Sequence, residues 1–407
     1  MKVAIVGAGA SGMSAALHAA WNGAEVSLYE RNPTAGRKLL VTGAGRCNIT
    51  NEAVSPEKYT CADPAWMESL LSQFGVRNLL DMLLEIGVPV RKTCDGWYYP
   101  LSDSAHSVVA AFTSALNMAG VTLRPSAQVT AIQDYAKGFI ISFENDDVEQ
   151  KAEFDRVIVS AGGKAHPSLG SRGELFSELK RLGHTVLHKR PALAPVIADL
   201  GALQPLQGVR LDAGVTLWEG SRRVAGTVGN LIFTQWGLNG PAVMDISHHI
   251  SAHPKARFDL ALNLLAPFQN AFDQLLAQKR TSRMPLKVFL SAFFPPKVAV
   301  LCIKNTRLPE EVLLCEVKDS EFERLLKNLV DARLRVADLR GFEYCQVSAG
   351  GVPVIEVDPR TLESQRVKGL FLTGETLDVV GPCGGYNLQF AFSSGALAGL
   401  AAARQGE

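Results

Sequence analysis

The chain begins with MKVAIVGAGASG, and these residues, Met1 to Gly12, decide the fold. Residues 3–6 are apolar, as in a buried strand, and the spacing of apolar residues over 10–22 predicts a helix. A second strand is predicted over residues 25–29. The order strand, glycine turn, helix, strand is a βαβ unit, which predicts a Rossmann-like α/β fold.

The glycines of this turn have the spacing G-x-G-x-x-G, typical of dinucleotide binding. Gly7 permits a tight turn, Gly9 lets a pyrophosphate approach the helix N-terminus, and Gly12 lets helix and strand pack closely. Glu30 lies eighteen residues after Gly12, at the end of the second strand. Its carboxylate would bind a ribose diol and argues against the 2′-phosphate of NADP. The sequence therefore predicts a dinucleotide site that includes Ser11 within the turn.

Three further features favour FAD over NAD. The glycine turn lies at the extreme N-terminus, Arg37 and Lys38 follow Glu30 closely, and a late apolar strand ends at Gly374 and Glu375. An acidic residue at a strand end suits the ribityl or ribose hydroxyls of an extended dinucleotide. A second G-x-G-x-x-G is absent from the sequence, so we expect no dedicated nicotinamide domain.

Changes in residue pattern divide the chain into three expected parts. Proline and short strands become frequent from Arg190 onward, and helical spacing returns near residue 265. A returning strand is predicted over 313–317 and a helix over 321–329. The expected parts are an FAD-binding domain (1–190 plus 346–407), a β-rich substrate domain (191–262 plus 305–345) and a helical insert (263–304).

Composition narrows the class of protein. The 407 residues are 47% hydrophobic and 20% charged, with a net charge of +1, which describes a folded protein without a global basic field. Seven cysteines occur without a C-x-x-C pair, and the histidines show no metal-ligand spacing, so we expect reduced thiols, no metal site and a cytoplasmic location. Residues 379–403 carry no charge but include a proline and five glycines, which favours a buried helix over a membrane span.

Longer motifs make the sequence similar to a known family. They are residues 36–40 (GRKLL), 42–51 (TGAGRCNITN), 231–242 (LIFTQWGLNGPA), 374–375 (GE) and 384–389 (GGYNLQ). Over essentially its whole length the chain resembles the BaiN/YhiN-like family of bacterial FAD-dependent oxidoreductases. The resemblance implies an FAD domain of the two-dinucleotide-fold type, interrupted by a β-barrel-like domain and a small helical domain. Phe390 departs from the tryptophan common at this position, and so do Pro382 and Cys383 before the double glycine.

The glycine turn, the acidic strand ends and the resemblance together define a set of expected FAD contacts. The candidate cofactor-binding residues are Gly7, Gly9, Ser11, Gly12, Glu30, Arg31, Arg37, Lys38, Gly45, Val129, Ala161, Gly162, Gly374, Glu375, Gly385, Asn387 and Leu388. The last three open the final helix, whose positive end would lie near the pyrimidine end of the flavin.

Chemistry is expected at Arg46, Cys47 and Asn48. A flavin that reduces a C=C bond delivers hydride to one carbon, and an acid protonates the other. Cys47 could be that acid, with Arg46 lowering its pKa. In the alternative interpretation, Cys47 packs under the flavin and Arg46 closes the loop. Cys383 and Tyr386 are further candidate acids.

The leading functional hypothesis is a reductase whose FAD takes hydride from NADH or NADPH and saturates a conjugated bond. The family includes ribosomal RNA dihydrouridine synthases, so uracil in 23S ribosomal RNA is the favoured acceptor. Residues 205–300 hold ten Lys or Arg against five Asp or Glu, a local excess of five that could bind RNA. The basic residues include Arg222, Arg223, Lys279, Arg280 and Arg283.

Two other functions stay open. A small unsaturated ketone, as for the family's bile-acid reductases, or an amine, as for its members described as aminoacetone oxidases, would need a lined pocket. Trp97, Phe233, Trp236 and Phe294 are the candidates for that lining. A flavin-bound module that binds RNA or protein without turnover is the third possibility. No membrane partner is expected.

Overall fold

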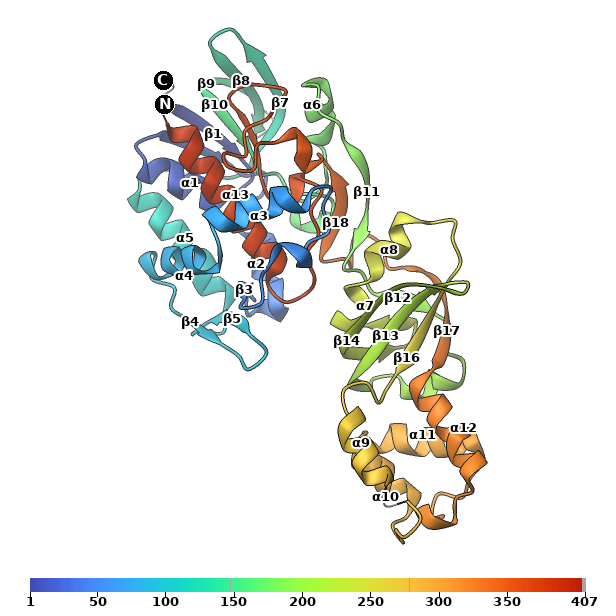
Figure 1. Ribbon diagram of the computed structural model, residues 1–407. Coiled ribbons are helices and arrows are strands. Elements are labelled where there is room, and N and C mark those ends of the chain that lie inside the picture. The colour runs from blue at the N-terminus through green and yellow to red at the C-terminus, as the bar shows by residue number, and fades with distance from the viewer. Residues whose placement is uncertain (147, 278, 405–407) are drawn as a thin grey trace. The chain divides into compact units, whose positions relative to one another are not determined.

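The computed structural model describes residues 1–146, 148–277 and 279–404 (Figure 1). The chain forms two compact units. The first consists of Met1–Arg190 and Gln346–Glu407, and the second of Pro191–Cys345.

A five-stranded parallel sheet is the centre of the first unit. Its strand order is β19-β10-β1-β2-β6. The bounds are β1 (Lys2–Val6), β2 (Glu25–Tyr29), β6 (Thr122–Arg124), β10 (Arg156–Val159) and β19 (Leu370–Leu372). Ile5 pairs with Leu28 on one side and Ile158 on the other, and all three are fully buried. The predicted Rossmann-like α/β class is thereby confirmed.

Two helices cross at unusually close range beside this sheet. They are α1 (Ala10–Trp21) and α13 (Tyr386–Ala403). A Cβ added to Gly395 would lie 2.1 Å from the carbonyl oxygen of Ser11, and one added to Gly399 would lie 2.3 Å from that of Ala15. Only glycine permits this approach. The uncharged stretch 379–403 is thus explained by packing, and none of the described helices is long and apolar enough to cross a membrane.

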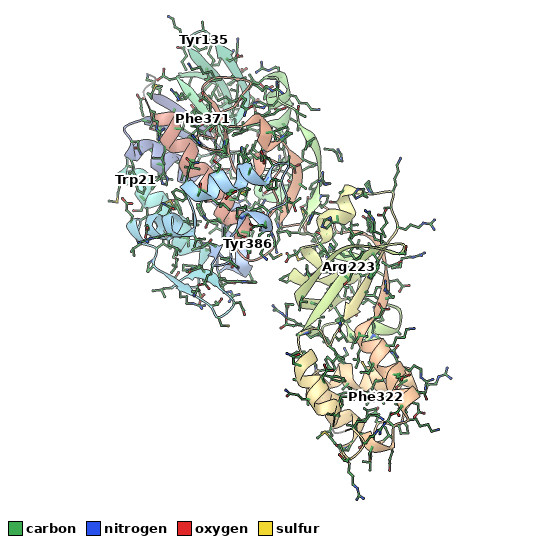
Figure 2. The ribbon with its side chains drawn as sticks, in the orientation of Figure 1. Trp21, Tyr135, Arg223, Phe322, Phe371 and Tyr386 are labelled. Atoms are coloured by element: carbon green, nitrogen blue, oxygen red, sulfur yellow. The ribbon has the colours of Figure 1, made fainter. Side chains whose placement is uncertain are left out.

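Smaller elements surround the sheet. The helices are α2 (Arg37–Leu40), α3 (Pro64–Gln73), α4 (Val76–Glu85), α5 (Ala105–Met118) and α6 (Phe176–Arg181). One antiparallel sheet has β3 (Thr50–Asn51), β5 (Trp97–Pro100) and β4 (Val90–Lys92), and a second has β7 (Ala127–Tyr135), β8 (Gly138–Asn145) and β9 (Val148–Phe154). The strands β11 (Leu187–Ala192) and β18 (Val347–Gly351) pair with each other. Phe371 lies fully buried within the first unit (Figure 2).

The second unit contains a closed barrel with the strand order β12-β15-β14-β13-β16-β17. The bounds are β12 (Val196–Ala198), β13 (Arg210–Glu219), β14 (Arg222–Thr234), β15 (Gly237–Asn239), β16 (Phe258–Asn263) and β17 (Ala332–Leu339). Two short helices, α7 (Pro241–Met244) and α8 (Ser247–Ala252), lie between β15 and β16 in the chain. Ala213, Val215 and Leu217 are buried inside, so the alternate residues of β13 face outward.

The helices of the second unit extend further along the chain than expected. They are α9 (Gln269–Leu276), α10 (Leu286–Ser291), α11 (Pro296–Thr306) and α12 (Asp319–Val330). The helix predicted over 321–329 lies within α12 and is confirmed. The strand predicted over 313–317 is wrong, because Leu314–Glu316 form a 3-10 turn. Leu314 and Val317 are both buried and three residues apart, which suits one face of a helical turn.

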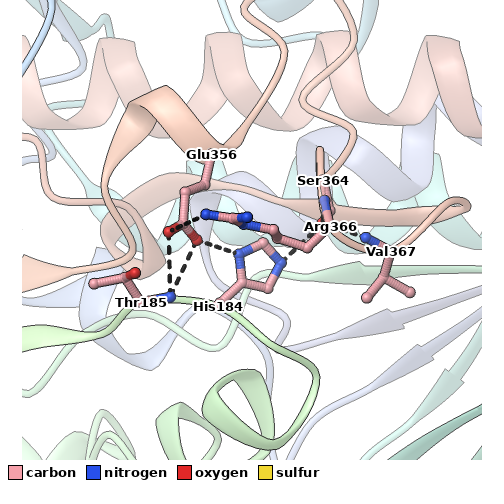
Figure 3. A network of polar contacts seen from close by, with 6 residues as sticks. All are labelled: His184, Thr185, Glu356, Ser364, Arg366 and Val367. Atoms are coloured by element: carbon pink, nitrogen blue, oxygen red, sulfur yellow. Dashed lines mark hydrogen bonds and ion pairs between the residues drawn. The ribbon is translucent and has the colours of Figure 1, made fainter.

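A buried polar network ties together distant parts of the first unit (Figure 3). The His184 Nδ1 atom lies 2.8 Å from Glu356 Oε2, and its Nε2 lies 2.8 Å from Ser364 Oγ. Ser364 Oγ already accepts the amide N–H groups of Arg366 and Val367, so its hydroxyl proton is available to Nε2. It follows that Nδ1–H donates to Glu356, which also accepts the Thr185 amide at 3.1 Å.

Candidate functional site

The three glycines of the N-terminal turn differ in what surrounds them. Gly7 has φ 100°, and a Cβ there would lie 2.5 Å from the carbonyl oxygen of Ser160. A Cβ on Gly12 would lie 1.8 Å from the carbonyl oxygen of Gly7. A Cβ on Gly9 would meet nothing within 4 Å. Gly7 and Gly12 therefore serve chain packing, whereas Gly9 leaves open the approach to the α1 N-terminus that a pyrophosphate needs.

Glu30 is buried beside this turn. Its Oε2 accepts the amide N–H of Ala8 at 2.9 Å, and its Oε1 accepts the amide and side-chain N–H groups of Asn32 at 2.8 and 2.6 Å. A carboxylate has about four acceptor directions. Three hydrogen bonds thus fix the Glu30 carboxylate at the turn, and one acceptor direction remains for a ribose hydroxyl.

Two of the basic candidates hold loops together. Arg31 pairs with Glu174 and donates to the Gln128 side chain at 2.8 Å. Arg37 donates to the Asn32 side chain at 2.8 Å. These contacts give both guanidinium groups a structural role.

Lys38 joins a polar cluster at the carboxyl ends of β10 and β19. Its Nζ lies 2.5 Å from Glu375 Oε2, while Glu375 Oε1 accepts the amide and hydroxyl of Ser348, each at 2.8 Å. A Cβ on Gly163 would lie 2.5 Å from Glu375 Oε1, and one on Gly374 would lie 2.7 Å from Ser11 Oγ. Glu375 is therefore held at the sheet edge where ligands of open α/β sheets bind. Ser348 could not be predicted from the sequence, because a serine inside a strand such as β18 belongs to no recognisable motif.

The remaining loops at this edge include three further candidates. Ala161 and Gly162 directly follow β10, and Gly162 has φ 75°. Val129 lies on β7, where the pairing with β8 shifts register between Val129 and Ala131. The amide of Ala127 donates to the carbonyl oxygen of Glu30 at 2.8 Å. The start of β7 is thus fixed next to the end of β2.

The loop that contains Gly45 and Cys47 has an unusual backbone. Gly43, Ala44, Gly45 and Cys47 all have positive φ, at 56°, 56°, 84° and 61°. Ala44 and Cys47 are strained, because residues with a side chain disfavour the left-handed region of backbone conformation. Such backbone strain in non-glycine residues is frequent at functional sites.

Cys47 and Arg46 do not form the expected pair. Burial raises the pKa of the Cys47 thiol to about 12, and a hydrogen bond with Thr42 opposes the rise only in part. The Arg46 guanidinium instead lies 4.8 Å from the ring centre of Tyr99, and its Nε donates to the Gly43 carbonyl at 3.4 Å. The expectation that Arg46 lowers the pKa of Cys47 is wrong, because burial dominates at the thiol.

Asn48 belongs to the segment where chemistry is expected, although the sequence gives it no role of its own. It is buried, and its Oδ1 has no hydrogen-bond partner among the described residues. A buried amide oxygen left unsatisfied costs about 1–3 kcal/mol. A bound group that donates a hydrogen bond here would remove this cost. The only signal in the sequence was its place in the motif next to Cys47.

The N-terminus of α13 lies directly against β3. A Cβ on Gly385, which has φ 95°, would lie 2.6 Å from the backbone of Thr50, and the Thr50 hydroxyl donates to Gln389 at 2.6 Å. Leu388 is half-buried in the first turn. The first turn of this 18-residue helix thus presents backbone amides and the positive end of its dipole beside the strained loop.

Tyr386 and Asn387 shape the loop before this helix. The Tyr386 hydroxyl donates to the Ala53 carbonyl at 3.5 Å, and its own carbonyl accepts from Tyr59 at 2.9 Å. The Asn387 side chain accepts the Gly381 amide at 2.9 Å and donates to the Gly381 carbonyl at 2.8 Å. Both candidates therefore have structural contacts in addition to any contact with the cofactor.

The structure bears on two of the four residues proposed to line a pocket, and the roles of Trp97 and Trp236 stay predictions. Phe233 and Phe294 are 1% and 3% exposed and belong to the packed interior of the second unit, so a lining role for them is wrong. Trp97 lies against Gly384, where a Cβ would be 3.2 Å from its indole nitrogen. In the described part of the chain, no cluster of three or more His, Cys, Asp or Glu side chains could hold a metal ion.

These features fit FAD. The open approach at Gly9, the fixed carboxylate of Glu30 and the unsatisfied oxygen of Asn48 are what a bound dinucleotide would use. When bound, FAD would supply hydride transfer.

Comparisons with known proteins agree with this assignment. The family model described as HI0933-like protein Rossmann domain matches residues 1–401. A 3-dehydro-bile acid delta(4,6)-reductase from Clostridium scindens is 36% identical, covering 99% of each chain. A ribosomal RNA dihydrouridine synthase from Escherichia coli is 30% identical, covering 96% of this chain and 95% of the relative.

Solved structures show the same fold at low identity. A 3-ketosteroid-delta4-(5alpha)-dehydrogenase from Rhodococcus jostii aligns with a TM-score of 0.53 at 16% identity, over 99% of this chain and 96% of the other. The FrdA subunit of Escherichia coli quinol fumarate reductase aligns with a TM-score of 0.52 at 16% identity, over 99% of this chain and 70% of the other. With the family model and the relatives, the motifs and the site establish that the chain belongs to the HI0933-like Rossmann-domain family, the BaiN/YhiN-like FAD-dependent oxidoreductases.

Proposed function

We propose that this enzyme takes a hydride from NADH or NADPH and saturates a conjugated C=C bond, with uracil in ribosomal RNA as the acceptor. The open approach at Gly9, flanked by the closed positions Gly7 and Gly12, carries the cofactor part of the proposal. The α1 N-terminus would hold the pyrophosphate, Glu30 a ribose, and Glu375 the ribityl chain. The amides that open α13 would stabilise negative charge at the pyrimidine end of the flavin.

The choice of RNA rests on charge and on relatives. Residues 205–300 hold ten basic against five acidic residues, and a relative at 30% identity is a ribosomal RNA dihydrouridine synthase. Lys279 is removed from the basic residues expected to bind RNA, because it pairs with Asp319 at 2.8 Å and donates to the Val317 carbonyl. Arg223, Arg280 and Arg283 form no ion pair within the described residues.

Dihydrouridine mapping of ribosomal RNA tests this acceptor. A strain lacking the gene should lose a dihydrouridine that the wild-type gene restores, because a reduced uracil arises only through the enzyme. A Gly9→Val gene, which blocks the pyrophosphate approach, should not restore it. Ribosomal RNA that is identical in all three strains would contradict the proposal.

A small conjugated ketone is the second candidate acceptor. The relative at 36% identity acts, by its name, on a 3-dehydro-bile acid. Purified enzyme with NADH or NADPH and a conjugated 3-dehydro-bile acid would then oxidise the nicotinamide, and RNA would be unchanged in the deletion strain. The two acceptors are therefore separated by two independent measurements.

Cys47→Ala tests the proposed proton donor. With a pKa of about 12, the thiol stays protonated at neutral pH and could give its proton to the substrate carbon. If it does, Cys47→Ala should lower the turnover number by about 100-fold or more, while the flavin stays bound. The measurement is single-turnover reoxidation of the reduced enzyme by substrate.

Cys302→Ala is the matched control for this experiment. Cys302 is also buried, with a pKa raised to about 12, but it lies on α11 in the second unit. Its loss should leave turnover unchanged. Equal turnover for wild type and Cys47→Ala, at equal flavin content, would assign Cys47 to packing alone.

A further inference from the structure

The outer surface of the barrel has a hollow beside Gly226. It has a volume of about 320 Å³ and is lined by Gly214, Thr216, Arg223, Gly226, Thr227, Val228, Asn263 and Ala266. Gly214 and Thr216 lie on β13 and face away from the buried Val215 and Leu217. Gly226 pairs with Thr216 across β13 and β14. Gly226 is exposed and carries no side chain, whereas Gly214 is buried, and a Cβ on Gly214 would lie 2.9 Å from the Cβ of Ala266.

Arg223 supplies the charge of this hollow. A Cβ placed on Gly226 would lie 2.5 Å from Arg223 Nη2, so the guanidinium group lies over the Gly226 backbone. Figure 2 labels Arg223 on the barrel unit. It is exposed and has no ion-pair or hydrogen-bond partner among the described residues. A guanidinium held over a polar hollow fits a phosphate group.

An aromatic and basic platform continues from the hollow along the same face. Trp218 pairs in register with Arg223 on β14 and with Asp259 on β16. The Arg333 guanidinium lies 4.8 Å from the Trp218 ring centre. Arg335, next on the outer face of β17, has a side chain that is 73% exposed and lies 3.9 Å from Asp259. Stacked Arg and Trp side chains are typical platforms for unpaired bases.

We infer that this face, the outer side of β14, β13, β16 and β17, binds a single-stranded segment of RNA. One nucleotide sits in the hollow with its phosphate on Arg223, and a neighbouring base stacks on the Arg333–Trp218 pair. An unpaired strand fits better than a duplex, because stacking requires a base that is splayed out of its helix. The inference rests on the proposed function, since it names the surface that would hold the RNA acceptor's strand.

Fluorescence anisotropy with a labelled single-stranded RNA of about 12 nucleotides tests the inference. Arg223→Ala should weaken binding about tenfold and make the slope of log affinity against log salt shallower by about 0.7, the loss of one phosphate contact. Gly226→Leu should fill the hollow, displace the end of Arg223 and also weaken binding about tenfold. Gly226 has no positive φ, and only the flexible end of Arg223 must move, so this variant should fold.

Arg360→Ala is the matched control, because it removes the same charge from an exposed position outside the hollow and outside residues 205–300. It should change affinity less than twofold. Equal effects of Arg223→Ala and Arg360→Ala, or equal affinity for a duplex RNA or an acidic peptide, would overturn the inference. Circular dichroism and flavin content confirm that each variant is folded.

The two proposals fail in different ways. If the wild-type protein binds the single strand through Arg223 but makes no dihydrouridine, the proposed function is contradicted and the RNA-binding surface is not. The second case is a strain that carries Arg223→Ala together with Gly226→Leu. If its protein binds RNA as wild type does and dihydrouridine forms normally, only the proposed RNA-binding surface is contradicted.

Discussion

Replacing Gly12 with alanine should give a chain that purifies without flavin and unfolds at lower urea concentration than wild type. The new Cβ would lie 1.8 Å from the carbonyl oxygen of Gly7 and 3.3 Å from the Cβ of Ser160. The nearest of these is backbone, and Gly7 is itself pressed against Ser160, so the turn cannot yield locally. We expect a loss of about 3 kcal/mol or more in the free energy of unfolding, at the upper end for overpacking.

Gly9→Val is the matched variant. A Cβ at Gly9 meets nothing within 4 Å, so the unfolding free energy of the flavin-free chain should stay within about 0.5 kcal/mol of wild type. The branched side chain would nevertheless occupy the pyrophosphate approach. FAD affinity, measured by flavin absorbance during titration, should fall at least tenfold, which is about 1.4 kcal/mol. Normal FAD affinity in Gly9→Val would place the cofactor elsewhere.

Glu356→Ala should destabilise the first unit by about 3–5 kcal/mol. The carboxylate is 5% exposed and accepts from His184 and the Thr185 amide, so its removal leaves two buried donors unsatisfied beside a cavity. Glu356→Gln keeps the volume and should cost less. The measurement is urea unfolding, with the exposed Glu149→Ala as control. A change below about 0.5 kcal/mol for Glu356→Ala would show that water satisfies both donors.

The same network makes the protein sensitive to acid. Burial lowers the pKa of His184 below 6.5, although its bond to Glu356 acts in the opposite direction. Burial alone would raise the pKa of Glu356, but hydrogen bonds from Thr185 and His184 bring it below 4.5. As the pH falls below the unfolded-state pKa of either group, the unfolded chain binds more protons than the folded one. The free energy of unfolding that both groups contribute at higher pH is therefore lost as the pH falls through their folded-state pKa values. The His184→Gln variant should show a flatter decline of unfolding free energy between pH 7 and pH 5.

Local parts of this structure could be predicted from sequence, and long-range contacts could not. The turn from Gly7 to Gly12 and the position of Glu30 at the end of β2 depend on neighbours in the chain, so the residue spacing was sufficient to predict them. Glu375 contacts Lys38, which is 337 residues away in the chain, and Ser348, which is 27 residues away, and no spacing rule predicts either contact. Cys47 shows the same limit. Its burial, which decides its pKa, is set by packing and has no signature in the neighbouring Arg46.

The close crossing of α1 and α13 also orders events during synthesis. Helix α1 leaves the ribosome long before α13, against which it packs, and the sheet receives its edge strand β19 only after the barrel unit has been synthesised. The barrel unit, by contrast, is one continuous stretch, Pro191–Cys345. Domains generally fold as units as they emerge. The inserted unit can therefore fold before the first unit is complete, because the first unit lacks β19 and α13 until residues 370–403 have been synthesised.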